Sequence, residues 1–391
     1  MRGDSAAPSA MRPTAVDTDR RPFVLIWELT QACELACDHC RAEAQPERHP
    51  DELTTAEGKR LLDQARSFGE NQLVVLSGGD PAARPDLVEF VEYGTDIGLS
   101  MTVTPSGTAS LTRDVVDDLA DAGVRRIALS IDGGFALEHD AFRGEEGSFA
   151  ATLEAAAHAR DAGVPLQVNT TVSARTVDQL PAVRELVADL GAALWSVFFL
   201  VPVGRGAMLD PVSPERAESV MEWLHDVASE ERFGVKTTEA PHYRRVAMQQ
   251  NRATADDSGN RAASTGGGPE GRGNSEQRSG PDRRGGIVAG DGFAFVSHTG
   301  EVYPSGFLPE SAGTVPEESI VDVYRDADLF ERLRDRSELT GKCGACEFKQ
   351  VCGGSRSRAF ATTGNPFAAD PLCSYVPEGY DGPMPDGTAA D

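Results

Sequence analysis

The sequence predicts an α/β protein: a partial (β/α)6 TIM-like barrel followed by a small C-terminal region that holds a metal centre. Three observations lead to this fold class. From Pro22 to about residue 235, β-like runs alternate with amphipathic helical patterns, an order typical of parallel sheets. The alternation stops after six units, whereas a complete barrel needs eight. The seven cysteines fall into two tight groups, a spacing that favours metal binding over disulfides where nothing indicates secretion.

The expected strands are short runs of apolar and β-branched residues, and each is followed by a helical pattern. Strands are expected at Phe23–Leu29, Leu73–Ser77, Leu99–Thr104, Arg126–Ile131, Pro165–Val172 and Trp195–Val201. Helices are expected at about Thr55–Phe68, Asp86–Ile97, Thr112–Ala122, Phe149–Ala162, Val177–Leu190 and Pro214–Glu231. Thr112 and Ser213, the latter followed by Pro214, are favourable N-terminal caps.

The chain is expected to divide into four segments. Residues 1–21 are polar and predict a disordered leader, and residues 22–235 form the barrel. Residues 249–286 are rich in Gly, Ser, Arg and Asn and predict a disordered insert, because they can bury little apolar surface. Residues 287–380 combine a short β-rich stretch with the second cysteine group, and a metal would act as the staple of so small a region.

Acidic residues dominate the composition. Asp and Glu number 62 against 37 Lys and Arg, which gives a net charge of −25, and only four of the cations are Lys. Such a surface suits a protein that stays soluble in concentrated salt, so we expect a halophilic source. It disfavours nucleic acid as a partner, because phosphate binding needs a basic face. We find neither an apolar run of about 18 residues nor a secretory signal, and expect a cytoplasmic protein with no membrane partner.

Three cysteines, Cys33, Cys37 and Cys40, follow the first expected strand in a CxxxCxxC pattern. Barrel enzymes place their active sites at this end of the strands. Three thiolates on one loop can hold three irons of a [4Fe–4S] cluster and leave the fourth iron open, which a reaction at the cluster requires. The alternative is a zinc knuckle in which His39 supplies a further ligand.

This loop resembles the signature of the radical S-adenosylmethionine (SAM) superfamily. The resemblance implies that the open iron binds SAM and that one electron from the cluster cleaves SAM to a 5′-deoxyadenosyl radical. It extends over about residues 22–235, because further motifs follow in order at the strand ends. The SAM contacts that it implies are Ser77, Gly78, Gly79, Asp80, Ser130, Asp132, Arg143 and Asn169, with Arg143 as candidate for the SAM carboxylate. His39 departs from the family pattern, which usually has an aromatic residue there. No general acid or base is assigned.

The second group, Cys343, Cys346, Cys352 and Cys373, supplies four thiolates. Four suffice to ligate one auxiliary [4Fe–4S] cluster fully, and a four-thiolate zinc site is the alternative. The spacing resembles the SPASM/twitch extension of radical SAM maturases. Because Ser305 stands where many relatives have cysteine, we expect one auxiliary cluster and not two.

The residues around these cysteines narrow the resemblance. The segments Cys346–Arg356, Gly364–Pro366 and Asp370–Cys373 resemble those of the tetrapyrrole-tailoring group, which acts in haem and haem d1 biosynthesis (Ahb- and NirJ-like enzymes). The resemblance implies decarboxylation of a tetrapyrrole propionate to vinyl and an electron donor such as ferredoxin or flavodoxin. The alternative is a maturase of a ribosomally made peptide. The candidate groups for substrate carboxylates or a haem iron are Arg205, His242, Arg244, Arg245 and His298.

Overall fold

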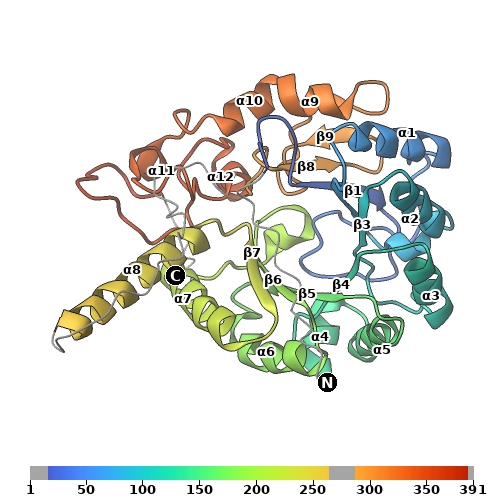
Figure 1. The fold of residues 1–391 in the computed structure, drawn as a ribbon, viewed down its shortest axis with the longest axis horizontal. Helices are drawn as coiled ribbons and strands as arrows, with labels where there is room; N and C mark the ends of the chain where they lie inside the picture. Colours follow the sequence, from blue (N-terminus) through green and yellow to red (C-terminus); the bar gives the residue numbers. More distant parts are fainter. Residues whose placement is uncertain (1–15, 264–286, 386–391) are drawn as a thin grey trace.

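The protein is described by a computed structural model that places residues 16–263 and 287–385. Its centre is a ten-stranded sheet with the strand order β10-β9-β8-β1-β2-β3-β4-β5-β6-β7. Neighbouring strands from β8 through β1 to β7 are parallel, and β9 and β10 continue the sheet in antiparallel fashion. The sheet curls, and helices cover its outer face (Figure 1). The predicted α/β class and partial barrel are therefore confirmed.

The strands are β1 Val24–Thr30, β2 Leu73–Gly78, β3 Ser100–Val103, β4 Arg126–Ser130, β5 Leu166–Val172, β6 Leu194–Phe199, β7 Gly234–Thr238, β8 Phe293–Val296, β9 Glu301–Tyr303 and β10 Gly313–Thr314. The α-helices are α1 Thr55–Arg66, α2 Leu87–Asp96, α3 Arg113–Asp121, α4 Ala136–Arg143, α5 Ser148–Asp161, α6 Leu180–Asp189, α7 Pro214–Glu230, α8 His242–Ala263, α9 Ile320–Asp326, α10 Asp328–Arg334, α11 Gly341–Ala345 and α12 Arg356–Thr363. Short 3₁₀ turns lie at η2 Pro81–Ala83, η3 Val177–Gln179 and η4 Gly204–Met208.

The two faces of the sheet differ in burial. In β1, Leu25, Trp27 and Leu29 are fully buried in the core beneath the helices, whereas Val24 and Ile26 on the other face are only half-buried. The same alternation recurs in the first half of β2, and β7 is not fully buried at any position. We call this second, concave face of β1–β7 the lumen. It lets solvent reach side chains inside the barrel.

The predicted helix starts are confirmed where the sequence offers a cap. Thr54 and Glu57 form a reciprocal capping box at α1. Thr112 accepts a hydrogen bond from the Val115 N–H at 3.3 Å, and Ser213 accepts one from the Arg216 N–H at 3.1 Å. These hydrogen bonds satisfy backbone donors that a helix N-terminus leaves unpaired.

The sheet is wider than six strands. Strand β7 pairs with β6, although its sequence Gly-Val-Lys-Thr-Thr shows too little apolar alternation for the sequence to predict it. Strand β8 pairs in parallel with β1. The β-rich stretch of the C-terminal region therefore continues the barrel sheet instead of forming a separate one.

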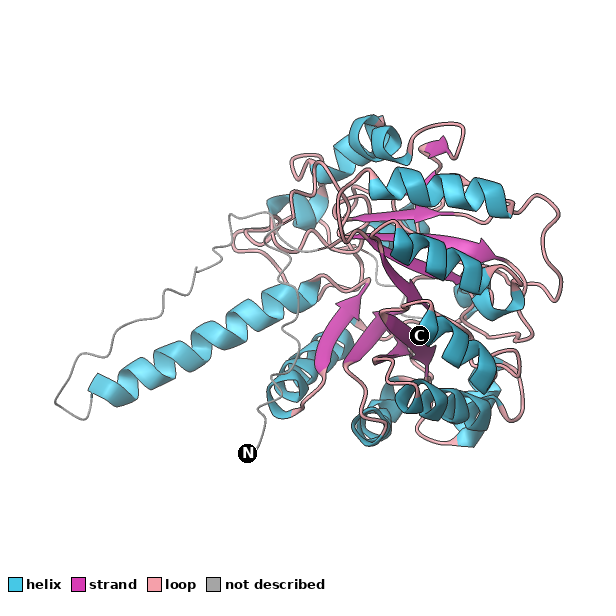
Figure 2. Ribbon diagram, turned by 45° about the vertical axis from the view of Figure 1, so that its right-hand side comes forward, coloured by secondary structure: helices cyan, strands magenta, loops and turns pink. Residues whose placement is uncertain are grey.

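Two segments expected to lack order are partly ordered. In the leader, the Thr18 hydroxyl donates to Asp291 Oδ1 at 2.7 Å, and Arg325 Nε donates to the Arg20 carbonyl at 2.8 Å. Helix α8 continues to Ala263, inside the expected insert, and extends away from the body of the molecule (Figure 2). Ala, Gln and Arg are common in its sequence and favour helix, whereas the Gly-rich composition begins after it. Residues 1–15 and 264–286 lie outside the described residues.

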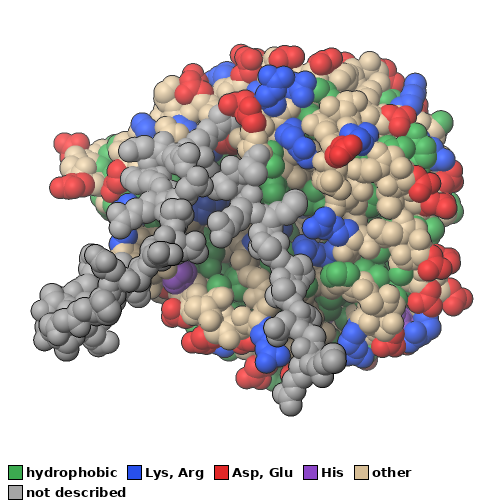
Figure 3. All heavy atoms as spheres, viewed as in Figure 1, with side chains coloured by type: hydrophobic (Ala, Val, Ile, Leu, Met, Phe, Trp, Pro, Cys, Tyr) green, Lys and Arg blue, Asp and Glu red, His purple; other side chains and the backbone are tan. Residues whose placement is uncertain are grey.

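Acidic side chains lie mainly around the rim of the face shown in Figure 3, where Lys and Arg side chains stand among them. Within the part of the chain that the structure describes, no helix has the length and apolar character required to cross a bilayer.

Candidate active site and metal centre

The first cysteine group lies on a closed loop at the carboxyl end of β1. The Cys33 N–H donates to the Gln45 carbonyl at 2.8 Å, and the Gln45 N–H donates to the Gln31 carbonyl at 3.0 Å. These bonds join the two ends of the loop. Cys33 and Cys37 are buried and Cys40 is half-buried, and the three pack into one cluster with neighbouring apolar side chains. The loop therefore gathers three thiols at the end of the barrel where active sites lie.

Backbone donors point at two of these sulfurs. The Leu35 N–H donates to Cys33 Sγ and the Ala44 N–H donates to Cys40 Sγ, both at 3.4 Å. Burial raises the pKa of Cys37 to about 11, against the opposing charge of Arg143. A thiol of this kind gives up its proton when a metal binds it. Three gathered thiols with N–H donors to sulfur are a donor set that fits an iron–sulfur cluster.

Two glycines hold the end of β2 against this loop. The Gly79 N–H donates to the Thr30 carbonyl at 2.8 Å, and the Asp80 N–H donates to the Ala32 carbonyl at 2.7 Å. A Cβ on Gly78 would lie 2.3 Å from Thr30 O, and one on Gly79 would lie 2.4 Å from Ala32 O. Gly78 also has a φ of +139°, which side chains rarely adopt. Glycine is therefore required at both positions for the backbones to approach.

Asp80 is buried and accepts hydrogen bonds from protein groups on both carboxylate oxygens. Oδ1 accepts from the Ala82 N–H at 3.0 Å and the Ser106 N–H at 3.2 Å, and Oδ2 accepts from the Thr108 hydroxyl at 2.7 Å. The Ser106 hydroxyl in turn lies 3.4 Å from Cys33 Sγ. Asp80 thus positions the loop after β3 beside the first cysteine. The sequence did not single out Ser106 or Thr108, because neither belongs to a motif.

A buried charged group lies behind the same cysteines. Asp132 Oδ2 is 3.4 Å from Arg143 Nη1 and 3.9 Å from His39 Nε2, and Oδ1 accepts from the Thr171 N–H at 2.7 Å. Although burial opposes it, His39 and Arg143 lower the pKa of Asp132. Burial lowers the pKa of His39 to about 4, so its imidazole is neutral at pH 7. That ring stacks on Phe142 with a centroid distance of 4.6 Å.

Several buried side-chain nitrogens at this site have no hydrogen-bond partner among the described residues. They are His39 Nδ1, Arg143 Nε and Arg205 Nη2. Arg205 also donates from Nε to the Cys37 carbonyl at 2.9 Å and from Nη1 to the Ala44 carbonyl at 3.2 Å. A buried donor without a partner is costly, so a bound ligand that accepts from it is stabilised. These groups fit a carboxylate-bearing cosubstrate beside the loop.

The remaining expected SAM contacts line the lumen. Ser77 is paired in register with Glu28 of β1, and Ser130 with Asn169 of β5. Asn169 Oδ1 accepts from Gln167 Nε2 at 2.7 Å. The structure therefore brings the predicted residues of β2, β4 and β5 to one concave face next to the cysteine loop.

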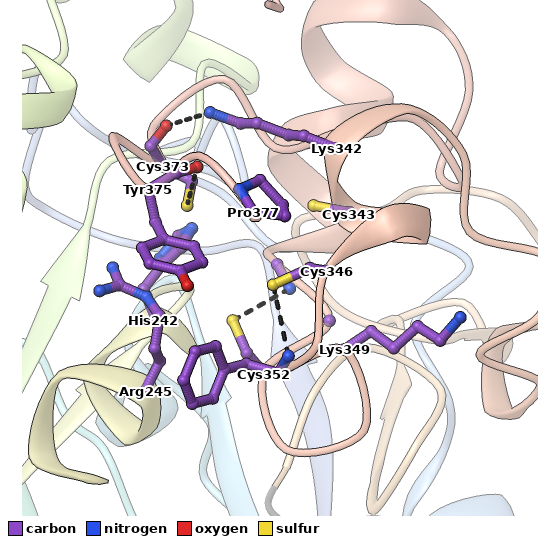
Figure 4. Close-up of a pocket in the computed structure, with 13 residues that line it drawn as sticks. His242, Arg245, Lys342, Cys343, Cys346, Lys349, Cys352, Cys373, Tyr375 and Pro377 are labelled. Atoms are coloured by element: carbon purple, nitrogen blue, oxygen red, sulfur yellow. Dashed lines mark hydrogen bonds between the residues drawn. The ribbon is translucent and has the colours of Figure 1, made fainter. Parts of the chain in front are cut away.

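The second cysteine group lies around a small pocket. Figure 4 shows Cys343, Cys346, Cys352 and Cys373 around it, with His242, Arg245 and Lys342 nearby. Backbone N–H groups of Phe348, Gly354 and Asp370 donate to the sulfurs of Cys346, Cys352 and Cys343, each at 3.4 Å. Four thiols with such donors fit a metal centre, either a cluster or zinc.

Burial keeps three of these four thiols protonated in the absence of metal. It raises the pKa of Cys346 to about 11 and those of Cys352 and Cys373 to about 12. Binding of a metal would therefore release protons. Among the described residues, no group of three or more His, Cys, Asp or Glu side chains converges on the position of a single metal ion.

Ser305 forms a hydrogen bond to the Glu239 carboxylate. Ser305, Ser355 and Ser357 donate from their hydroxyls to the Glu239 carboxylate at 3.1, 2.5 and 3.0 Å. These bonds join the ends of β7 and β9 to the start of α12. Three serines around a carboxylate act as a hydrogen-bonded link between the C-terminal region and the barrel.

Four of the five residues expected to bind substrate carboxylates or a haem iron are otherwise engaged, and Arg205 keeps the partnerless Nη2 described above. Arg244 donates to the Val351 and Ile287 carbonyls at 2.8 and 2.6 Å, and Arg245 pairs with Glu218. His242 lies 3.1 Å from Asp370 in the interior, and His298 lies 2.7 Å from Glu28. The structure differs from the sequence prediction here, because packing of the C-terminal region uses these side chains.

Comparison with known proteins agrees with this geometry. Residues 27–186 match the model of the Radical SAM superfamily. SuiB of Streptococcus suis, solved with bound S-adenosylmethionine, has the same fold, with a TM-score of 0.68 at 16% identity over 91% of this chain and 78% of SuiB. The fold, the closed three-cysteine loop and the family match define a radical SAM enzyme.

Sequence relatives show which group of radical SAM enzymes this chain resembles. The AdoMet-dependent heme synthase of Methanosarcina barkeri is 41% identical over 91% of this chain and 97% of its own length. That of Nitratidesulfovibrio vulgaris is 37% identical over 95% of this chain and 98% of its own. The PqqA peptide cyclase of Rhodopseudomonas palustris is 30% identical over 91% of this chain and 88% of its own. The chain belongs to the radical SAM family that contains the AdoMet-dependent heme synthases.

Proposed function

We propose that the enzyme makes haem by decarboxylating propionate side chains of iron-coproporphyrin III to vinyl groups. The observation that carries this proposal is the 41% identity to an AdoMet-dependent heme synthase along almost the whole of both chains. The reaction removes a hydrogen atom from the propionate β-carbon and releases carbon dioxide, which leaves one electron for an acceptor. When bound, SAM and a reduced cluster supply the radical that abstracts this hydrogen.

The first site would hold the cluster and SAM through groups already in place. Cys33, Cys37 and Cys40 would ligate three irons, and Arg143 would pair with the SAM carboxylate. The partnerless Arg143 Nε supports this assignment. Ser77, Gly78, Gly79, Ser130, Asp132 and Asn169 would surround the rest of SAM, with Asp80 holding the neighbouring loop.

The second site would hold one auxiliary [4Fe–4S] cluster on Cys343, Cys346, Cys352 and Cys373, in a SPASM/twitch-like region. Such a centre would supply an acceptor for the electron that decarboxylation leaves. The backbone donors to three of the four sulfurs support a cluster, since hydrogen bonds to sulfur tune its potential. The link between Glu239 and Ser305 supports one centre and not two, because Ser305 is already engaged.

We further propose a ferredoxin or flavodoxin as the reductant of the first cluster. The 62 acidic residues suit a cytoplasm rich in salt. Both proposals are testable by reconstituting activity with each donor over a range of KCl concentrations.

The test of the function is an anaerobic assay of the reconstituted enzyme with SAM, dithionite and iron-coproporphyrin III, followed by mass spectrometry. We expect deoxyadenosine together with loss of carbon dioxide from the porphyrin. Deoxyadenosine with an unchanged porphyrin would refute the substrate and direct the search to other tetrapyrroles. Peptides would follow, because peptide cyclases are among the relatives.

A further inference from the structure

Two cations face the lumen from strands that are not neighbours. Arg126 begins β4 and Lys236 lies in β7, with β5 and β6 between them. Ile127 and Val235, which adjoin them in sequence, contribute to the core beneath the helices, so Arg126 and Lys236 point to the concave face. The charge of Arg126 also lowers the pKa of Lys236, as expected for two cations on the same concave face.

Neither cation has an anionic partner among the described residues. Arg126 donates to Gln167 Oε1 at 3.3 Å, while its Nε is buried without an acceptor. Lys236 makes no hydrogen bond or ion pair with the described part of the chain. By contrast, Lys59 pairs with Glu89, and Lys342 and Lys349 donate to backbone carbonyls.

The two cations lack a carboxylate partner in a chain that is rich in carboxylates. Acidic residues outnumber basic ones by 62 to 37, so a carboxylate could readily have been placed beside two adjacent cations. Two like charges in a concave protein environment repel each other and lose solvation. Although solvent reaches the Lys236 side chain, the surrounding protein and the charge of Arg126 lower its pKa to about 8. An anion that bound between the two would relieve both costs.

We propose that Arg126 and Lys236 form a binding site for a carboxylate of the substrate, inside the lumen and away from the cysteine loop. This inference rests on the proposed function, in which the substrate is a tetrapyrrole with several propionates. Ser130, at the loop end of β4, is four residues beyond Arg126, which corresponds to about 13 Å of strand. A disc-shaped ligand with carboxylates around its edge can place one on the two cations and another next to the cysteine loop.

The side chains suit this task in complementary ways. The planar guanidinium of Arg126 can form two parallel hydrogen bonds to a carboxylate, and the ammonium of Lys236 adds a mobile point charge. Gln167 holds Arg126 on one side and donates to Asn169 on the other. The carboxylate site is thereby joined through hydrogen bonds to a residue proposed to contact SAM.

The experiment is a binding titration with the fully reconstituted protein and SAM, without reductant, followed by porphyrin absorbance. The probes are iron-coproporphyrin III and its tetramethyl ester, which has the same ring without carboxylates. The variants are Arg126→Gln, Lys236→Gln and the double variant. The matched controls are Arg113→Gln and Lys59→Gln, which remove an exposed and a half-buried cation on the outer helices.

We expect each lumen variant to weaken binding of the tetra-acid about tenfold, which corresponds to about 1.4 kcal/mol. The double variant should weaken it by about two orders of magnitude, with no change for the ester or in either control. Equal affinity of the double variant and the wild type for the tetra-acid would overturn the carboxylate site while leaving the proposed function intact. A wild type that binds neither probe would instead refute the proposed substrate. Lys236→Arg should retain affinity, which separates loss of charge from loss of folding.

Discussion

Asp370 joins the second metal site to the barrel, and its replacement by Asn tests that connection. The carboxylate is fully buried and lies 3.2 Å from Arg358 Nη1. It also accepts the Ser355 N–H at 2.6 Å, while the Asp370 N–H donates to Cys343 Sγ. Arg358 donates onward to the carbonyls of Phe199 and Leu200 at the end of β6. The carboxylate of Asp370 therefore joins α12 to the barrel through Arg358, and its backbone N–H contacts a metal-site cysteine.

We expect Asp370→Asn to lower the free energy of unfolding by about 3 kcal/mol. Breaking a buried ion pair by removing one partner costs about 3–5 kcal/mol, because the other charge stays buried without compensation. The lower end of this free-energy range applies, because the side-chain amide oxygen of the variant still accepts a hydrogen bond. Arg358 also keeps its carbonyl acceptors. The matched control is Asp161→Asn, which breaks an exposed pair with Arg113 at 2.8 Å and should cost at most about 1 kcal/mol.

The assay is urea unfolding of the metal-free protein, monitored by tryptophan fluorescence. The rate at which the cysteine thiols react with a thiol reagent is measured alongside it. Although burial raises it, Arg358 and His242 hold the pKa of Asp370 well below its ordinary value. A lowered pKa stabilises the fold above the unfolded value of about 3.9 and loses that effect as the pH falls toward the folded value. The difference between wild type and variant should therefore shrink below about pH 4. Equal stabilities of Asp370→Asn and Asp161→Asn at pH 7 would refute this reasoning.

Three further predictions follow from the structure. Cys37→Ala should abolish SAM cleavage, whereas Cys346→Ala should remove about half of the bound iron and leave uncoupled SAM cleavage; unchanged iron content in Cys346→Ala would mean zinc or no metal at the second site. Gly78→Ala should cost about 2–4 kcal/mol, because its Cβ would lie 2.3 Å from Thr30 O at a φ of +139°. Gly163→Ala, with positive φ but nothing within 4 Å, should cost only about 1 kcal/mol, and equal unfolding midpoints would contradict this account. Affinity for iron-coproporphyrin III should fall as the pH rises through about 8, where Lys236, facing the fixed charge of Arg126, loses its proton. Lys236→Arg should bind equally well on both sides of that pH, and a wild type with a flat profile would argue against the role of Lys236.

The barrel could be predicted because its strands and helices repeat a strong local pattern. The caps at Thr112 and Ser213 fix where helices begin, and the apolar runs of the first six strands are long enough to be recognised. Strand β7 was not predicted from the sequence, because Gly-Val-Lys-Thr-Thr has little β pattern of its own. Its pairing with β6 makes it a strand. The part of α8 beyond residue 249 was not predicted, because the composition was averaged over residues 249–286. The helix-forming first part of that segment did not stand out in the average.

The candidate site could be predicted where chemistry is concentrated in a short motif. The CxxxCxxC loop and the Gly78-Gly79 pair can be recognised in the sequence. In the structure, the cysteines share a closed loop, and the glycines allow the backbones to approach closely. Ser106 could not be found in this way, because its role comes from contact with Asp80 and Cys33, which precede it by many residues. The hydrogen bond from Arg244 to the Val351 carbonyl could not be predicted either, because it forms only when the C-terminal region packs against α8.

The lumen cations show why charge in sequence is a poor guide to charge at a site. Arg244 and Arg245 stand together in the sequence, yet each has partners that serve folding. Arg126 and Lys236 are 110 positions apart and each looks like an ordinary strand residue, but β4 and β7 turn them toward the same space. In a chain with net charge −25, Arg126 is informative because its buried Nε has no acceptor among the described residues. Such a cation is best explained by an anion that the protein meets only when it works, and here the substrate proposed for the family supplies that anion.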